Sequence, residues 1–525
     1  MKTMQGALLK AGGVMRRATA GWPLRRRSRA PDLPRPRTKS WVARGLLAAA
    51  VLGYVTFFVL WGFRNFDRYA ITGFDFGIHD QAVWLLSRGL NPFVTISGSN
   101  YFGDHLSWIM FFVVPFYWLF PSAKVLILFQ TLALGLAAAP AFLVAREKLR
   151  SEWLAAGVGV AYLANPYLWW INYEQFHPDV FAVPLVFLAM FFAMRRRWVG
   201  FVVAVVLMLL VKEDVPLLVF GLGILVALRY NRRIGAVTSV LAALWLFVNF
   251  HFLLPAMSGT GSLAGYVVSH SERIPFGGPT GFLKTLVTRP WKIVSQAFAG
   301  HRPWYYLQVF APVAFLSFLS PWTLLLLAAP LVANGLSTYS YQYSIQHHYG
   351  TLVVPSLVIA AAFGIARASG PRLRGTLVAV LLASAILCSW LWGPAPGTRH
   401  PGFWAHAPSA YSRSLDVALK LIPADAAISV EYHLDTHLEH RAEIYEFPNP
   451  WYLHQWADRR TDGKSLPERA ARVTYILVPR NQDKVSTKVF EQLILDGEFR
   501  IAYERDGVVL LVRQAPPPTV GTSAR

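Results

Sequence analysis

The sequence has one cysteine, Cys388, and few charged residues. A single cysteine excludes an intramolecular disulfide and a metal cluster held by cysteines. Charged residues make up 15% of the 525 residues and hydrophobic residues 54%, whereas an ordinary soluble protein has roughly 25% charged residues. A Walker phosphate loop, an H-E-x-x-H zinc motif and a G-x-S-x-G nucleophile elbow are also absent from the sequence. A soluble multidomain protein, an ABC-type ATPase and a membrane zinc protease are therefore disfavoured.

Long apolar runs are what the chain has in quantity. Several approach the roughly 17–25 residues of a transmembrane helix, and their continuous rather than alternating pattern excludes an outer-membrane β-barrel. Residues 42–63 predict an uncleaved first span, because the run is too long for a signal peptide. Basic clusters at 146–150, 195–197, 229–233 and 367–374 then place about ten further spans by the positive-inside rule. We expect an α-helical polytopic membrane protein with about eleven transmembrane helices.

The predicted topology divides the chain into four regions. Residues 1–41 predict a disordered basic cytoplasmic tail, and 42–392 a transmembrane domain whose first outer loop, 64–105, carries an interfacial helix. Residues 393–513 predict a small extracytoplasmic α/β domain, and 514–525 a disordered end. Within residues 1–45, twelve Lys or Arg and one Asp give half of the net charge of +22. This tail suits an anionic membrane surface, and the positive-inside rule favours that interpretation over nucleic-acid binding.

Two further predictions concern local structure. The apolar segment 106–120 contains Pro115, and a full span there would place the basic cluster at 146–150 outside, so we interpret it as re-entrant or interfacial. In the C-terminal region, the residue pattern predicts three strands and two helices. The strands are expected at 427–431, 474–478 and 508–512, and the helices at 412–421 and 488–497.

Four polar clusters interrupt the apolar sequence, and the predicted topology places all four on the outer face. Ionisable groups at membrane depth are costly, so they are candidates for function. The clusters are Asp75–Gln81 with Asp104 and His105, Glu174–Asp179, Lys212–Asp214, and Gln346–Tyr349.

Each cluster has a structural and a functional interpretation. Residues 75–88 predict a helix on the membrane surface, where Asp75 is either its cap or a catalytic carboxylate. The pair Asp104–His105 either binds a metal or phosphate or satisfies itself by hydrogen bonding. His177 and Asp179 either bind a metal or phosphate or cap a loop. The charges of 212–214 either neutralise one another in a turn or line a wet cavity. His347, His348 and Tyr349 suit an anion or metal site, or a polar collar at a span.

An ordered set of motifs resembles a bacterial family of uncharacterised multi-pass membrane proteins, known as a domain of unknown function. The resemblance covers roughly residues 45–515. The motifs are Phe74–Gln81, Gly103–His105, Phe176–Pro178, Lys212–Asp214, His348–Tyr349 with Pro355, Ile422–Pro423 and Tyr445–Pro448. That family more distantly resembles the GT-C superfamily of membrane glycosyltransferases, which take sugars from polyprenyl-phosphate carriers at the outer face.

The GT-C resemblance implies roles for the clustered residues. Asp75 matches the usual catalytic acidic position, where a paired Asp-Glu is common; here Phe76 follows, and Asp80 is the alternative. The implied catalytic residues are thus Asp75 and Asp80. The implied substrate and phosphate ligands are Gln81, His105, Lys212, Glu213, Asp214, His347, His348 and Tyr349. The implied ligands of a divalent metal, Mg or Mn, are Asp104, His177 and Asp179.

The resemblance also implies an activity and a location. We expect a hexosyl or pentosyl transferase in the bacterial plasma membrane, with the N-terminus cytoplasmic and the C-terminal domain outside. Its partners would be the lipid bilayer, a polyprenyl-phosphate-linked sugar donor and an envelope glycan, lipid or protein acceptor, and no nucleic acid. Two alternatives stay open at this point: a transporter or flippase of a lipid-linked glycan, and a non-catalytic envelope-assembly protein.

Overall fold

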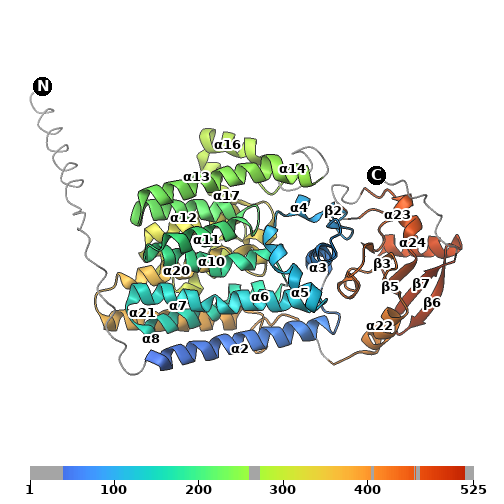
Figure 1. Ribbon diagram of the computed structural model, residues 1–525, viewed down its shortest axis with the longest axis horizontal. Coiled ribbons are helices and arrows are strands. Elements are labelled where there is room, and N and C mark those ends of the chain that lie inside the picture. Colours follow the sequence, from blue (N-terminus) through green and yellow to red (C-terminus); the bar gives the residue numbers. More distant parts are fainter. Residues whose placement is uncertain are drawn as a thin grey trace, which may run out of the picture. The chain divides into compact units, whose positions relative to one another are not determined.

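The structure is a computed structural model that describes residues 40–71, 73–174, 176–258, 272–403, 407–454, 456 and 462–514 (Figure 1). The predicted basic tail, up to residue 39, and all but the first residue of the predicted disordered end lie outside these residues. The described chain from Trp41 onward forms one compact unit.

Five helical segments are long and apolar enough to cross a membrane. They are α2 (Ser40–Phe66), α6 with α7 (Lys124–Leu136 and Ala138–Leu149), α13 continuing through a π-helical turn into α14 (Arg232–Val248 and Leu254–Met257), α20 (Val353–Ala366) with the turn before it, and α21 (Pro371–Trp392). A multi-pass helical protein is therefore confirmed.

Six shorter apolar segments have 10–17 residues. They are Trp108–Leu119 with α5 (Val114–Leu119), α8 (Glu152–Leu163), Pro178–Met194 with α10 (Ala182–Met194), α11 (Trp198–Leu209), α12 (Val215–Arg229) and Pro321–Leu336 with α19 (Leu325–Leu336). Whether each of these crosses the membrane decides the count of eleven spans, which stays a prediction.

Helices adjacent in sequence pack against each other, α7 with α8, α10 with α11, and α12 with α13 (Figure 1). In the α12–α13 pair, a Cβ added to Gly235 would lie 2.1 Å from the backbone nitrogen of Ala227. Glycine therefore lets these two backbones approach closely, as small residues do between membrane helices. α20 is almost wholly buried and contacts α7, α10 and α19.

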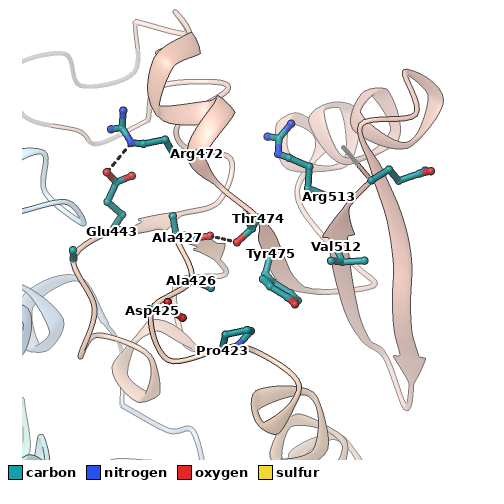
Figure 2. Close-up of a pocket in the computed structure, with 12 residues that line it drawn as sticks. Pro423, Asp425, Ala426, Ala427, Glu443, Arg472, Thr474, Tyr475, Val512 and Arg513 are labelled. Carbon is teal, nitrogen blue, oxygen red and sulfur yellow. Dashed lines mark hydrogen bonds and ion pairs between the residues drawn. The ribbon is translucent and has the colours of Figure 1, made fainter. Parts of the chain in front are cut away.

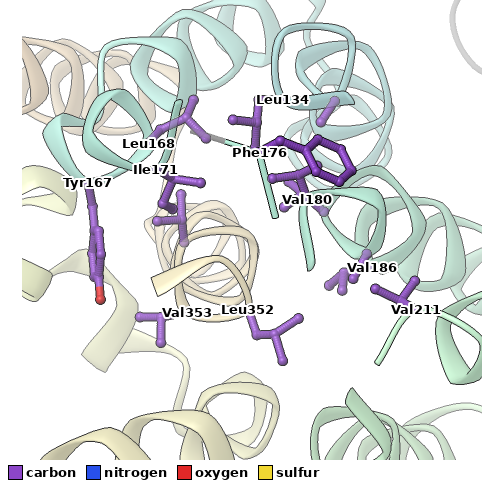
Figure 3. Packing of buried hydrophobic residues seen from close by; sticks show 14 of the residues in the cluster. Leu134, Tyr167, Leu168, Ile171, Phe176, Val180, Val186, Val211, Leu352 and Val353 are labelled. Atoms are coloured by element: carbon purple, nitrogen blue, oxygen red, sulfur yellow. The ribbon is translucent and has the colours of Figure 1, made fainter. Parts of the chain in front are cut away.

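The buried apolar core reaches the loops that carry the polar clusters. Leu134, Phe176 and Val180 are fully buried, and Leu352 is nearly so; Figure 3 shows them directed into a shared interior. Phe176 and Val180 flank His177 and Asp179 in sequence, so the apolar packing fixes the backbone of that cluster.

The segment 106–120 is broken into a 3-10 turn (Trp108–Phe112) and the six-residue α5. Twelve helical residues extend over about 18 Å at 1.5 Å per residue, against about 30 Å for the hydrocarbon core. Pro115 stands in the first turn of α5. The segment is too short for a straight span, which supports the re-entrant or interfacial interpretation.

A five-stranded mixed sheet forms most of the C-terminal region, in the order β4-β3-β5-β7-β6. β3 pairs in parallel with β4 and β5, whereas β7 pairs antiparallel with β5 and β6. The strands are β3 (Ile428–Val430), β4 (Ile444–Glu446), β5 (Tyr475–Pro479), β6 (Phe499–Arg505) and β7 (Val508–Arg513), with helices α22 (Ala410–Lys420), α23 (Pro467–Arg472) and α24 (Lys484–Leu495). The three predicted strands and two predicted helices are confirmed, while β4, β6 and α23 were missed.

The remaining elements connect these parts. They are α3 (Gly73–Ser87), the hairpin β1 (Phe93–Val94) and β2 (Ser99–Asn100), α4 (Tyr101–Asp104), α9 (Pro166–Tyr173), α16 (Gly278–Thr288), α17 (Pro290–Ala297) and α18 (Arg302–Phe310).

α3 differs from the predicted surface helix. Ten of its 15 residues are buried, because it packs against α5, β1 and the turn at Asp435–His437. The helix begins at Gly73, so Asp75 lies in its first turn and not at its cap position. The predicted helix is thus present, but Asp75 is not its cap, and segments 360 residues further on cover much of it. Its position at the membrane surface stays a prediction.

Candidate functional site

Three of the four predicted clusters meet in one place. The chain after α9, the turn between α11 and α12, and the chain before α20 bring their polar side chains together next to the first turn of α3. We call this group the central polar cluster; its residues are Glu174, His177, Asp179, Lys212, His347 and His348.

Glu174 organises the two histidines before α20. Its Oε1 lies 2.5 Å from Nδ1 of His347, and its Oε2 accepts a hydrogen bond from the backbone N–H of His348. The Nδ1 of His348 lies 3.3 Å from the same Oε2. Although burial raises the pKa of Glu174, these histidines lower it well below its ordinary value. Glu174 is therefore an anion held between two imidazoles.

His177 stacks on His348, with ring centroids 3.6 Å apart and an interplanar angle of 19°. Burial and the neighbouring His348 lower the pKa of His177 to about 4, against the opposing effect of Asp75 and Glu174. His177 is thus neutral near pH 7, the form in which an imidazole binds a metal.

Glu174, His177 and His348 can hold a metal ion, because one donor atom from each lies within 4.8 Å of the others. Two imidazoles and a carboxylate suit Zn²⁺ or Mn²⁺ better than Mg²⁺, which prefers oxygen ligands. Of the three predicted metal ligands, only His177 belongs to this triad. Asp179 instead pairs with Lys212, and Asp104 lies near His105.

Lys212 supplies a buried positive charge. Its Nζ lies 3.5 Å from Oδ2 of Asp179, and 9% of the residue is exposed. Burial lowers the pKa of Lys212, but Asp179, Asp214 and Glu213 raise it above its ordinary value. Burial together with Asp179 and Glu213 raises the pKa of Asp214 to about 6, against the effect of Lys212. The positive charge of Lys212 is therefore neutralised mainly by Asp179, which lies outside this turn.

His105 and Glu213 link the first outer loop to this turn. Nδ1 of His105 lies 3.0 Å from Oε1 of Glu213, and the backbone N–H of Leu106 donates to Oε2 at 3.1 Å. Although burial raises the pKa of Glu213, His105 and Lys212 lower it to about 2. Glu213 is consequently occupied in holding the loop against α12.

Asp75 lies beside the central polar cluster. Its carboxylate is exposed, acts electrostatically on His177, and is near Tyr339 and Tyr349. Arg273 stacks on the Tyr339 ring at 4.7 Å from its centroid. Among the described residues, Asp75 has no hydrogen-bond or ion-pair partner. It is the one predicted catalytic residue that an incoming molecule can reach.

Asp80 lies outside the central polar cluster, although it is on the same helix as Asp75. It is 1% exposed, accepts a hydrogen bond from the Tyr117 hydroxyl at 2.5 Å and pairs with His440. Gln81 also contacts other segments: its side-chain amide donates to the Thr95 hydroxyl and to the backbone oxygen of Arg441. Both predicted site residues therefore join α3 to the C-terminal region.

A second group of acids lies along this contact. We call it the buried acid cluster: Asp80, Asp435, Glu439 and Glu446 are each at most 6% exposed. The carboxyl group of Glu439 lies within side-chain hydrogen-bonding reach of Asp80. Burial and neighbouring carboxylates raise the pKa of Asp435 and of Glu439. This cluster was not predicted from the sequence, although Leu434–Arg441 is rich in acids and histidines for a buried segment.

Two more residues of the site were not assigned a role from the sequence. Glu174 is the C-cap of α9, and His177 follows three residues later in extended backbone. His79 on α3 contacts the Tyr101 hydroxyl at 2.9 Å through Nδ1, and its ring packs edge-on against His177. The sequence could not predict that His79 contacts both the Tyr101 hydroxyl and the His177 ring.

A pocket of about 690 Å³ lies elsewhere, at one end of the C-terminal sheet (Figure 2). Arg472 pairs there with Glu443 at 2.8 Å, and the Thr474 hydroxyl donates to the backbone oxygen of Ala427. No residue of the central polar cluster lines it.

The chain is similar to ArnT from Cupriavidus metallidurans bound to undecaprenyl phosphate, with 15% identity, 90% of this chain and 98% of that chain covered, and a TM-score of 0.53. The apo state of ArnT has a TM-score of 0.52 to this chain. The Archaeoglobus fulgidus oligosaccharyltransferase complex with Zn and sulfate is less similar. Its identity to this chain is 13%, 83% of this chain and 68% of that chain are covered, and the TM-score is 0.45. The chain therefore shares the fold of ArnT.

The family follows from the sequence. The family described as predicted membrane protein (DUF2079) matches residues 67–510, and the chain belongs to it. Both parts of the predicted resemblance, to a family of unknown function and to the GT-C fold, are thereby confirmed. Among curated proteins, none matches the chain.

Proposed function

We propose that this protein is a glycosyltransferase that moves a sugar from a polyprenyl-phosphate carrier to an envelope acceptor at the outer face of the bacterial plasma membrane. The observation that carries the proposal is the position of Asp75, an accessible carboxylate beside buried cationic and histidine side chains, in a protein with the fold of ArnT. ArnT was solved with undecaprenyl phosphate, which supports a lipid-linked donor.

Asp75 acts as the general base in this proposal. It takes the proton of an acceptor hydroxyl, and the hydroxyl oxygen forms a bond to C1 of the sugar. The bond between C1 and the carrier phosphate oxygen breaks, and the phosphate leaves with the electron pair. An accessible carboxylate in the first turn of a helix is suited to this task, because acceptor and base must come within about 3 Å.

Lys212, His347 and His348 stabilise the negative charge that develops on the leaving phosphate. Their fixed, largely buried positions make this more effective than solvent, since no reorganisation is needed during the reaction. A divalent metal at Glu174, His177 and His348 would add Lewis-acid stabilisation of that phosphate. Tyr349 lies next to Asp75 and Lys212 and lines the same place.

The other predicted ligands have supporting tasks. His105, Glu213 and Asp214 hold the first outer loop against α12 and set the position of Lys212. Asp80 and Gln81 position α3, and Asp104 lies at the end of α4 beside His105. The lipid bilayer and an envelope glycan, lipid or protein acceptor are the proposed partners, and the C-terminal α/β region the part outside the membrane.

The test compares lipid-linked sugars and envelope glycans, by mass spectrometry, in cells that lack the protein and in cells rescued with variants. Asp75→Asn should fail to rescue and should let one lipid-linked donor accumulate. Asp67→Asn is the matched control, because Asp67 is an exposed acid eight residues earlier whose partner is Lys124. Full rescue by Asp75→Asn at equal expression would overturn the catalytic role and favour the transporter or assembly alternatives.

A further inference from the structure

The helical hairpin formed by α16 and α17 combines positive charge with exposed apolar side chains. Residues 278–297 contain Lys284, Arg289 and Lys292 and no Asp or Glu. All three basic residues are exposed. A basic segment without acids is attracted to anionic phosphate groups, whatever molecule carries them.

The apolar residues of α16 lie on one face. Leu283, Leu286 and Val287 are spaced i, i+3 and i+4, which places them on one side of a helix. They are 60%, 46% and 82% exposed. Lys284 projects about 100° away from Leu283 around the helix, at the edge of this face.

α17 repeats the pattern on its next turns. Trp291, Val294 and the following Phe298 are spaced i, i+3 and i+7, and they are 64%, 60% and 62% exposed. The opposite face of α17 packs on α19: Ile293 is half-buried, and the Gln296 amide donates to the backbone oxygen of Leu336. The apolar faces of both helices are thus those that the protein itself leaves uncovered.

The hairpin follows a candidate membrane span and lies close to the candidate site. It follows α14, which ends at Met257, and precedes α18, which begins at Arg302. The backbone N–H of Thr338, two residues after Leu336, donates to the backbone oxygen of Arg273, whose side chain stacks on Tyr339. The C-terminal end of α17 therefore lies near the residues that precede α20, which also approach Asp75.

We propose that α16 and α17 form an interfacial element that lies in the membrane surface beside the site. Leu283, Val287, Trp291, Val294 and Phe298 enter the acyl boundary, and Lys284, Arg289 and Lys292 contact anionic lipid phosphates. An amphipathic helix with Trp and Leu on one face and Lys or Arg at the edge of that face has this orientation in a bilayer. The single, buried Cys388 makes the proposal testable by site-specific labelling.

The experiment uses the full chain in nanodiscs, with Cys388→Ser as background and one new cysteine carrying an environment-sensitive fluorophore. Val287→Cys and Val294→Cys report on the hairpin, and Val485→Cys, an exposed valine on α24 of the C-terminal region, is the matched control. Brominated lipids should reduce the emission at 287 and 294 at least about twofold more than at 485. Equal quenching at the three positions, with iodide reaching all of them, would overturn the proposal.

The lipid composition tests the basic residues separately. Quenching at 287 and 294 should be stronger in nanodiscs that contain phosphatidylglycerol than in phosphatidylcholine alone, and Lys284→Gln with Lys292→Gln should remove the difference. The same quenching in both lipids would overturn the phosphate contacts. These readouts need no sugar transfer, so a negative result for Asp75→Asn and a negative result here are independent.

Discussion

Asp80 and His440 form an ion pair 3.1 Å long, between Oδ2 of a carboxylate on α3 and Nε2 of an imidazole 360 residues later. Burial lowers the pKa of His440, but Asp80 raises it above its ordinary value. The Tyr117 hydroxyl of α5 donates to the same carboxylate. Asp80 therefore ties α3, and with it Asp75, to α5 and the C-terminal region.

This pair predicts a clear difference between the two aspartates of α3. Asp80→Asn and His440→Gln should each destabilise the protein, and the double variant should lose less than the sum, with a coupling of about 0.5–3 kcal/mol. Asp75→Asn should leave stability unchanged within about 0.5 kcal/mol, because Asp75 is exposed. Unfolding in detergent measures both, and additive effects of Asp80→Asn and His440→Gln would contradict the pairing.

Gly77 lets the buried acid cluster approach α3. A Cβ added to Gly77 would lie 2.0 Å from Oε1 of Glu439, so the buried side chain of Glu439 would have to move. Gly77→Ala should therefore loosen the contact between α3 and the C-terminal region, seen as faster proteolysis of residues 407–514. Gly53→Ala on α2 is the control, since its Cβ would meet nothing within 4 Å. Equal proteolysis of the two variants would contradict the close approach.

The metal triad predicts binding of one Zn²⁺ or Mn²⁺ ion to chelator-treated protein. Glu174→Gln and His348→Gln should each weaken that binding by more than about tenfold, since even outer partners of metal ligands contribute tenfold or more. Calorimetric titration measures the affinity. His433→Gln is the control, because His433 is an exposed histidine that also pairs with a glutamate. Unchanged affinity in the triad variants would remove the site.

Replacing Lys212 should strongly lower the free energy of unfolding. Removing its charge leaves Asp179, Glu213 and Asp214 buried with less compensation, so Lys212→Met should cost about 3–5 kcal/mol of unfolding free energy. Adding Asp179→Asn should restore part of that loss. Lys488→Met, at an exposed position of α24, should be nearly neutral. If Lys212→Met were equally neutral, Lys212 would not be the partner of these acids.

Much of the fold follows from local patterns. The predicted first span, 42–63, lies within α2, and three strands of the C-terminal sheet are where their apolar runs begin and end. Three polar clusters meet because each is at a helix end on one side of the predicted membrane. The positions of the basic clusters and the order of the spans are enough to predict that these clusters lie on the same side of the membrane.

Contacts over long sequence distances could not be predicted in this way. Asp75 and Asp80 are five residues apart, so they project about 140° apart around a helix and reach different neighbours. Which of them is accessible depends on His440 and Glu439, and no local pattern in α3 shows these partners. For the same reason, the triad of Glu174, His177 and His348 depends on a fold that joins residues 174 positions apart.

The raised pKa of Glu446 predicts that its contribution to the free energy of unfolding falls as the pH rises. Burial, Glu431 and Asp75 raise its pKa to about 8 in the folded protein, against about 4.3 when unfolded. The folded state therefore binds one more proton between these values. Its contribution is complete below about pH 4 and is lost towards pH 8, at up to about 1.4 kcal/mol per pH unit. Thermal unfolding midpoints between pH 5 and 8 measure the slope.

Glu446→Gln should reduce this slope, because an amide has no proton to lose at the same place. It should not abolish it, since burial raises the pKa of Asp435 and Glu439 in the same direction. Glu491→Gln, at an exposed position of α24, should leave the slope as it is. The same slope in the wild type and in Glu446→Gln would contradict the raised pKa of Glu446, because the difference between the two proteins isolates the contribution of this carboxyl group.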